Sequence, residues 1–194
     1  MPIIDYNVSW MLFNLYLALL ALLFGYLALV IRWKIAKIIF GILWLLYLPN
    51  TIYIFTDLEH FLSQWYRLGL PLSLYLIFQY ALFEIAGITI FIFALVPFEK
   101  WIHKNKHYKS SFKVLMVLFN FLIAFGMVLG RVERINSWEF FTATAKVFSA
   151  AVSIVTSLDL IGLTILFGFL CNFVYFLLRD PIHAFAKQIF HELD

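Results

Sequence analysis

Residues 70–96, LPLSLYLIFQYALFEIAGITIFIFALV, decide the class of fold. They contain a single acidic residue, Glu84, and no basic residue. An α-helix rises about 1.5 Å per residue, so this stretch exceeds the roughly 20 residues that cross the hydrocarbon core of a bilayer. Because backbone groups in lipid must be hydrogen-bonded within the segment, the stretch is predicted to be a transmembrane helix.

Most of the chain repeats this pattern. Hydrophobic residues make up 64% and charged residues 13% of the 194 residues, whereas a soluble domain carries about a quarter charged residues. The segments expected to span the membrane are, approximately, residues 9–31, 35–56, 70–96, 114–130 and 160–178. We therefore predict an all-α fold, a polytopic membrane helix bundle that forms a single transmembrane domain over residues 1–194.

The loops between these segments differ in their content of Lys and Arg. The first loop, the third loop and the tail hold ten basic residues: Arg32, Lys34, Lys37, Lys100, Lys104, Lys106, Lys109, Lys113, Arg179 and Lys187. The other two loops hold four: Arg67, Arg131, Arg134 and Lys146. Since cytoplasmic loops are enriched in basic residues, the N-terminus is predicted outside and the C-terminus in the cytoplasm.

Residues 140–157 do not fit a transmembrane helix well. They are apolar enough to touch lipid, but they include Lys146 and several Ser and Thr residues. We predict an interfacial helix on the outer surface of the membrane. A sixth transmembrane span is the alternative, and it would place the C-terminus outside.

Residues 48–61, LPNTIYIFTDLEHF, end the second predicted span with several polar side chains. Pro49 removes a backbone donor and disfavours helix at Leu48, so a kink is expected there. If the helix resumes, one narrow stripe that should face the bundle contains four residues: Asn50, Tyr53, Asp57 and His60. The alternative is a helix end whose polar residues only cap it and anchor it at the interface.

Residues 126–140, GMVLGRVERINSWEF, form a second polar cluster at the end of the fourth predicted span. Its candidate site residues are Arg131, Arg134, Asn136, Trp138 and Glu139. The predicted topology places this cluster on the same side of the membrane as Asp57. Because Arg favours bidentate contacts with carboxylates, we expect Asp57 to pair with Arg131 or Arg134. A solvated helix end with interfacial arginines is the alternative.

The two polar clusters resemble the motifs of a bacterial multi-pass membrane protein family that is known only as a domain of unknown function. The matching residues are Leu48, Pro49, Asn50, Tyr53, Thr56, Asp57, Leu58 and His60, and then Leu129, Gly130, Arg131, Arg134, Asn136, Ser137, Trp138 and Glu139. The chain departs from the family pattern at Thr51-Ile52, where Ala-Pro is frequent, and at Glu139, where Asp is frequent. The resemblance implies a bacterial integral membrane protein and supplies no reaction, substrate or cofactor.

Two further features bear on chemistry. Glu84 lies near the middle of the third predicted span, where ionisable groups are functional candidates, and it is expected either to form an interhelical hydrogen bond or to relay a proton or ion. Asp57 and His60 are spaced like two metal ligands, but a catalytic zinc site needs three protein ligands. We therefore predict no metal site, and the cofactor stays unknown.

Three functions remain open. The first is a protein with an outward-facing polar site that binds or transports a small ligand, an ion or a lipid headgroup. The second is a membrane-embedded enzyme that acts at the outer leaflet, with Asp57 or His60 as acid or base. The third is a structural or assembly subunit, in which the two motifs form a network of ion pairs that locks helices together.

The expected partner is the lipid bilayer, in a bacterial inner membrane. The basic residues 97–113 set the topology and attract anionic lipid. They are not interleaved with enough aromatic residues to favour nucleic acid as a partner. Because five spans are few for a monomeric transporter, a homo-oligomer is also considered.

Overall fold

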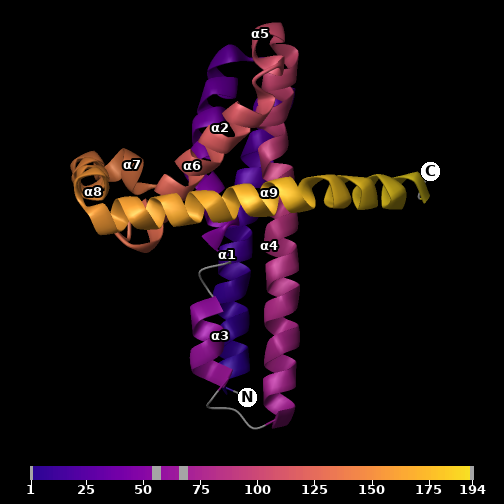
Figure 1. Cartoon of the computed structure of the whole chain (residues 1–194), viewed down its shortest axis with the longest axis vertical. Helices are drawn as coiled ribbons and strands as arrows, with labels where there is room; N and C mark the ends of the chain where they lie inside the picture. The colour runs from indigo at the N-terminus through magenta and orange to yellow at the C-terminus, as the bar shows by residue number, and fades with distance from the viewer. Residues whose placement is uncertain (1, 54–57, 66–69, 193–194) are drawn as a thin grey trace. The chain divides into compact units, whose positions relative to one another are not determined.

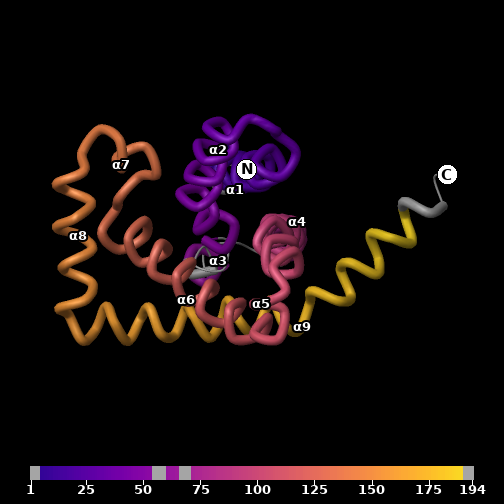
Figure 2. The backbone as a smooth tube through the Cα atoms, turned by 90° about the horizontal axis from the view of Figure 1, so that it is seen from above, coloured from indigo at the N-terminus to yellow at the C-terminus, as the bar shows by residue number. Residues whose placement is uncertain are grey.

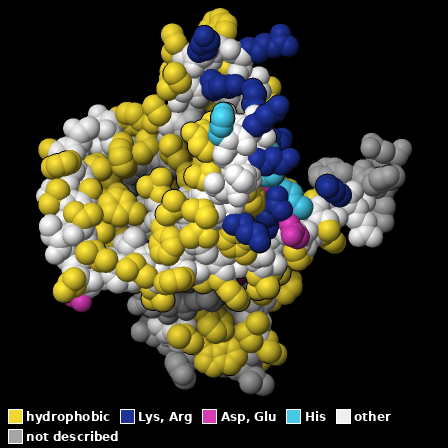
Figure 3. All heavy atoms as spheres, turned by 45° about the horizontal axis from the view of Figure 1, so that its top comes forward, with side chains coloured by type: hydrophobic (Ala, Val, Ile, Leu, Met, Phe, Trp, Pro, Cys, Tyr) yellow, Lys and Arg dark blue, Asp and Glu magenta, His cyan; other side chains and the backbone are white. Residues whose placement is uncertain are grey.

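The computed structural model describes residues 2–53, 58–65 and 70–192 (Figure 1). All regular structure in these ranges is helical, and five helices are long and apolar enough to cross a membrane. Hydrophobic side chains cover much of the molecular face in Figure 3, as expected for helices that contact lipid. The all-α class and the five candidate membrane helices are thus confirmed.

The chain forms two compact units, Met1–Ala94 and Leu95–Asp194. One long helix, α4 (Leu70–Lys104), belongs to both units, with residues 70–94 in the first and residues 95–104 in the second. The two units are described separately below.

The first unit is built on α1 (Pro2–Val30) and α2 (Lys34–Tyr47), which pack side by side. Aromatic contacts join them, since the ring of Phe24 lies 6.0 Å from that of Phe40 and 5.5 Å from that of Tyr47. The buried Trp44 donates its indole N–H to the carbonyl of Ala94 over 2.8 Å, which ties α2 to α4. A short helix, α3 (Leu58–Trp65), precedes α4 in the chain.

Pro49 ends α2 instead of only bending it. The α-helix stops at Tyr47 and continues as a 3-10 turn, η1 (Leu48–Thr51), and the second candidate membrane span consists of both elements, Lys34–Thr51. Two side chains of this turn bind backbone carbonyls: Asn50 Nδ2 donates to Tyr47 over 3.0 Å, and Thr51 Oγ1 donates to Leu48 over 2.7 Å. A single helix over residues 35–56 is therefore not formed, because proline interrupts the ladder and local side chains stabilise the break.

The second unit contains the end of α4 and five further helices. They are α5 (Lys106–Lys109), α6 (Phe112–Arg131), α7 (Glu139–Thr142), α8 (Thr144–Thr156) and α9 (Leu158–Glu192). Helix α6 packs against α9, and α8 contacts both (Figure 2). Helices α4 and α9 continue through Pro97 and Pro181, beyond the expected span ends at residues 96 and 178.

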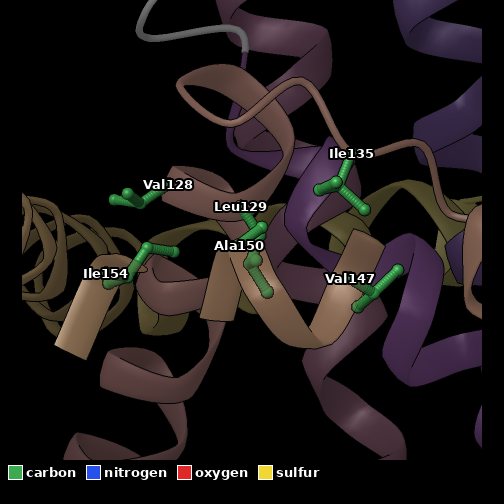
Figure 4. Packing of buried hydrophobic residues seen from close by; sticks show 6 residues of the cluster. All are labelled: Val128, Leu129, Ile135, Val147, Ala150 and Ile154. Atoms are coloured by element: carbon green, nitrogen blue, oxygen red, sulfur yellow. The ribbon is translucent and has the colours of Figure 1, made fainter. Parts of the chain in front are cut away.

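The core of the second unit joins the end of α6 to α8. Val128, Leu129 and Ile135 pack against residues on one face of α8, namely Val147, Ala150 and Ile154 (Figure 4). With 13 residues, α8 rises only about 20 Å, which is short of the roughly 30 Å hydrocarbon core. Its interfacial position nevertheless stays a prediction.

Candidate functional site

The first predicted motif is divided between separate elements. Asn50 is buried in η1, Tyr53 is half-buried just after it, and His60 is exposed on α3. Asp57 lies outside the described residues, as does any pairing that involves it. The predicted stripe of Asn50, Tyr53, Asp57 and His60 requires one continuous helix. Instead, α2 ends at Tyr47 and a separate helix, α3, begins at Leu58.

A partly buried group of neutral side chains fixes α3 in the first unit. Asn7, which is fully buried, donates from Nδ2 to Gln64 Oε1 over 2.7 Å and to Gln79 Oε1 over 3.3 Å. Its Oδ1 accepts from Gln64 Nε2 over 3.0 Å and from Trp10 Nε1 over 3.1 Å. We call Asn7, Trp10, Gln64 and Gln79 the amide cluster. It joins α1, α3 and α4 without any formal charge.

The amide cluster also positions His60. The imidazole ring lies edge-on to Trp10, with the ring centroids 5.8 Å apart. The same indole packs edge-on against Phe83 of α4 at 5.5 Å. His60 is therefore an exposed side chain whose ring packs against Trp10.

Glu84 is half-buried in α4, one helical turn after the buried Tyr80. The candidate membrane span Pro71–Lys104 includes this residue. Its two predicted roles, an interhelical hydrogen bond and a relay, both stay predictions.

The second motif forms the connection from α6 to α7. Helix α6 ends at Arg131, and the amides of Val132 and Glu133 both donate to the carbonyl of Val128, over 3.0 and 3.2 Å. Arg134 then adopts a φ of 53°, in the left-handed region that favours glycine. The next amide, that of Ile135, donates back to Leu129 over 3.0 Å, and its side chain enters the core.

The helical stripe expected for Arg131, Arg134 and Trp138 is not formed, because α6 ends at Arg131. Arg131 is half-buried at that end, whereas Arg134 and Trp138 are exposed. The left-handed turn is what changes the direction of the chain between them.

The acidic residues of this motif bind groups within the second unit. Glu139 Oε2 accepts from the Asn136 amide over 2.6 Å and from Asn136 Nδ2 over 3.2 Å, while Oε1 accepts from Lys146 Nζ over 2.6 Å. The hydrogen bond from the backbone N–H of Asn136 has the largest effect and the one from Lys146 the next largest, and together they hold the pKa of Glu139 below its ordinary value. Glu133 accepts from Ser153 of α8 over 3.0 Å. These carboxylates fasten the connection to α8.

The second unit also contains a polar group that lies outside both predicted motifs. Glu99 Oε1 accepts from the Tyr175 hydroxyl over 2.5 Å and from Arg179 Nε over 2.8 Å, and Oε2 accepts from Arg179 Nη2 over 2.8 Å. We call Glu99, Tyr175 and Arg179 the Glu99 clamp. Arg179 also donates from Nη1 to Asp180 over 2.7 Å, and its guanidinium lies 5.7 Å from the ring centre of Phe112.

A sequence signal for the clamp did exist. Tyr175, Arg179 and His183 follow one another at intervals of four, which places polar groups on one face of a helix. Glu99 lies just beyond the third predicted span, in a segment whose predicted role rests on its lysines alone. Within the described residues, no group of three His, Cys, Asp or Glu side chains is arranged to hold a metal ion.

The comparisons with known proteins give one result. A family described as "Protein of unknown function (DUF1361)" matches residues 13–174 of the chain. This result confirms the expected membership of an uncharacterised family, whereas the bacterial origin and the motif pattern stay predictions. The comparisons with curated proteins and with solved structures give no match.

Proposed function

The chain belongs to the DUF1361 family of proteins of unknown function, and from that premise we propose that it is a membrane protein that binds an anionic group through Arg134 and Trp138. The proposal places this site at the outer surface of the membrane, in agreement with the loop charges. The anionic group is a phosphate, carried by a lipid headgroup or by a small soluble molecule.

The backbone of Arg134 carries this proposal. Among the described residues, Arg134 is the one non-glycine residue whose φ lies in the left-handed region. That conformation costs an L-residue about 1–2 kcal/mol, whereas glycine adopts it freely. Because strained residues cluster at functional sites, a long cationic side chain at this position is best explained by what the guanidinium binds.

The surroundings of Arg134 favour an anion as ligand. The nearby carboxylates of Glu133 and Glu139 accept hydrogen bonds from Ser153, Asn136 and Lys146. The exposed guanidinium of Arg134 offers paired N–H donors that match a phosphate. The exposed indole of Trp138 suits the headgroup region of a bilayer.

Replacing Arg134 by glycine separates binding from folding. The purified full chain is titrated with glycerol 3-phosphate by calorimetry, and the number of phosphatidylglycerol molecules that it retains is counted by native mass spectrometry. Loss of charge-assisted hydrogen bonds worth about 1.5–3 kcal/mol should weaken binding roughly 10- to 100-fold. Arg134→Gly should unfold at the same temperature as the wild type or higher, because the left-handed strain is removed.

The matched control is Lys187→Gln, which removes one exposed positive charge from α9. It should bind both probes as the wild type does, while Arg134→Lys should bind with intermediate affinity. Binding of lipid alone identifies a headgroup, and binding of glycerol 3-phosphate identifies a soluble ligand. Wild-type protein that binds neither probe, or Arg134→Gly that binds like the wild type, would overturn the proposal.

A structural role is the second candidate, and the bonds of Glu139 and Glu133 to α8 favour it. In that case Arg134 only forms the turn that follows α6, and its replacement by glycine should leave binding of both probes unchanged. The same Arg134→Gly variant therefore decides between the two.

A further inference from the structure

Four stacked aromatic rings lie at the junction of α4, α5 and α6. The ring of Phe119 stacks on Phe98 at 4.0 Å, Phe98 on Trp101 at 5.7 Å, and Trp101 on Tyr108 at 5.3 Å. The planes of neighbouring rings differ by 24°, 8° and 21° respectively. We call these four residues the aromatic ladder. It begins at the buried Phe119 and ends at the exposed Trp101 and Tyr108.

The ladder fixes the turn between α4 and α6. Backbone bonds support the same turn, since Tyr108 donates to Asn105 and Ser111 donates to Tyr108, each over 3.0 Å. Asn105 Nδ2 also donates to the carbonyl of Trp101 over 2.7 Å. Residues 97–113 are therefore a folded surface and not an open loop.

This surface is rich in lysine. Its exposed lysines are Lys100, Lys104, Lys106, Lys109 and Lys113, and basic side chains are exposed on the face in Figure 3. The one acidic residue between positions 97 and 113 is Glu99. Its carboxylate is bound by Arg179 and Tyr175, so it does not neutralise the lysines.

We propose that residues 97–113 form a preformed binding site for anionic phospholipid, in which Trp101 and Tyr108 enter the interface and the lysines contact headgroup phosphates. Aromatic rings favour the headgroup region, and lysines extend their charges from apolar surfaces towards it. Because the ladder supports the turn that carries the lysines, the site differs from diffuse attraction of a flexible basic loop. It involves residues other than those of the proposed Arg134 site and does not depend on it.

A local probe separates this site from any other lipid contact. A polarity-sensitive fluorophore on Ser110→Cys reports on this segment alone, because the natural Cys171 is buried. The labelled full chain is placed in nanodiscs with increasing phosphatidylglycerol in phosphatidylcholine. The wild type should respond at a low fraction of phosphatidylglycerol, and Lys106→Gln/Lys109→Gln should need about twice that fraction or more.

The decisive variant is Trp101→Leu, which stays apolar but breaks the ladder. It should shift the midpoint as far as the double lysine variant, while Trp101→Phe should respond like the wild type. The matched control is Trp33→Leu, because Trp33 is 81% exposed between Arg32 and Lys34 but has no stacked ring in the described part of the chain. A wild type that shows no preference for phosphatidylglycerol, a Trp101→Leu that responds like it, or a Trp33→Leu that shifts equally would each overturn the proposal.

Discussion

Each of the two units contains its own polar cluster, one of neutral side chains and the other containing charged ones. In the first unit, the amide cluster around the fully buried Asn7 consists of neutral groups. In the second, the Glu99 clamp joins a buried carboxylate to an Arg179 side chain that remains 30% exposed. Neutral amides can be buried at modest cost when they are paired, whereas a charge needs a partner and benefits from access to water. Removal of one member should therefore cost more stability in the Glu99 clamp than in the amide cluster.

Removal of Arg179 should have the largest effect. Arg179→Leu leaves the Glu99 carboxylate buried without its bidentate partner, which should lower the free energy of unfolding in detergent by about 3 kcal/mol. The lower end of the usual range applies because the guanidinium is partly exposed. Chemical denaturation followed by circular dichroism measures the change.

The double variant Glu99→Met/Arg179→Leu tests the physical reason. It removes both charges, so it should recover most of the lost stability. If the double variant is as unstable as Arg179→Leu alone, the loss comes from packing around Arg179 and not from an unpaired charge.

Removal of Asn7 should have a smaller effect. Asn7→Leu leaves the amide groups of Gln64 and Gln79 without their shared partner, at a cost of about 1–3 kcal/mol. Because the cluster fastens α3, hydrogen exchange in residues 58–65 should become faster. The exposed Ser9→Ala in the same helix is the control and should leave exchange unchanged. Equal exchange in Asn7→Leu and the wild type would mean that other contacts hold α3.

This contrast also separates what the sequence could predict from what it could not. Long apolar segments such as residues 70–96 determine the fold class by themselves, because lipid allows few alternatives. The partners of Glu99 lie 76 and 80 positions later in the chain, and no local pattern pairs them. The sequence predicts only a kink at Pro49 and assigns Asn50 to a candidate site, whereas the side chains of Asn50 and Thr51 bind the backbone beside Pro49 and the helix ends there.

Close packing between α6 and α9 should contribute less to stability than either polar cluster. A Cβ atom added to Gly168 would lie 2.1 Å from the ring of Phe121, so Gly168→Ala forces that ring to move and should cost about 1–2 kcal/mol. Gly162→Ala in the same helix meets no atom within 4 Å, and it should stabilise the helix by about 0.5 kcal/mol. Thermal unfolding of the two variants measures the difference. If both variants shift stability in the same direction, close approach at Gly168 does not limit packing.

The exposed Glu139–Lys146 pair should contribute least, and its contribution should depend on pH. The pKa of Glu139 is lowered by the Asn136 amide and by Lys146, so its stabilising effect is complete above the ordinary pKa of 4.5 and is lost as the pH falls through the lower, folded-state value. Glu139→Gln should therefore be slightly less stable than the wild type at pH 7, and the difference should disappear in stronger acid. Thermal unfolding of both proteins from pH 7 to pH 3 gives this comparison. Because a solvated pair is screened by salt, the difference at pH 7 should also shrink in high salt. If the difference in unfolding temperature between the two proteins does not change with pH, it comes from the shape of the side chain. The charge of Glu139 would then contribute nothing measurable to the connection with α8.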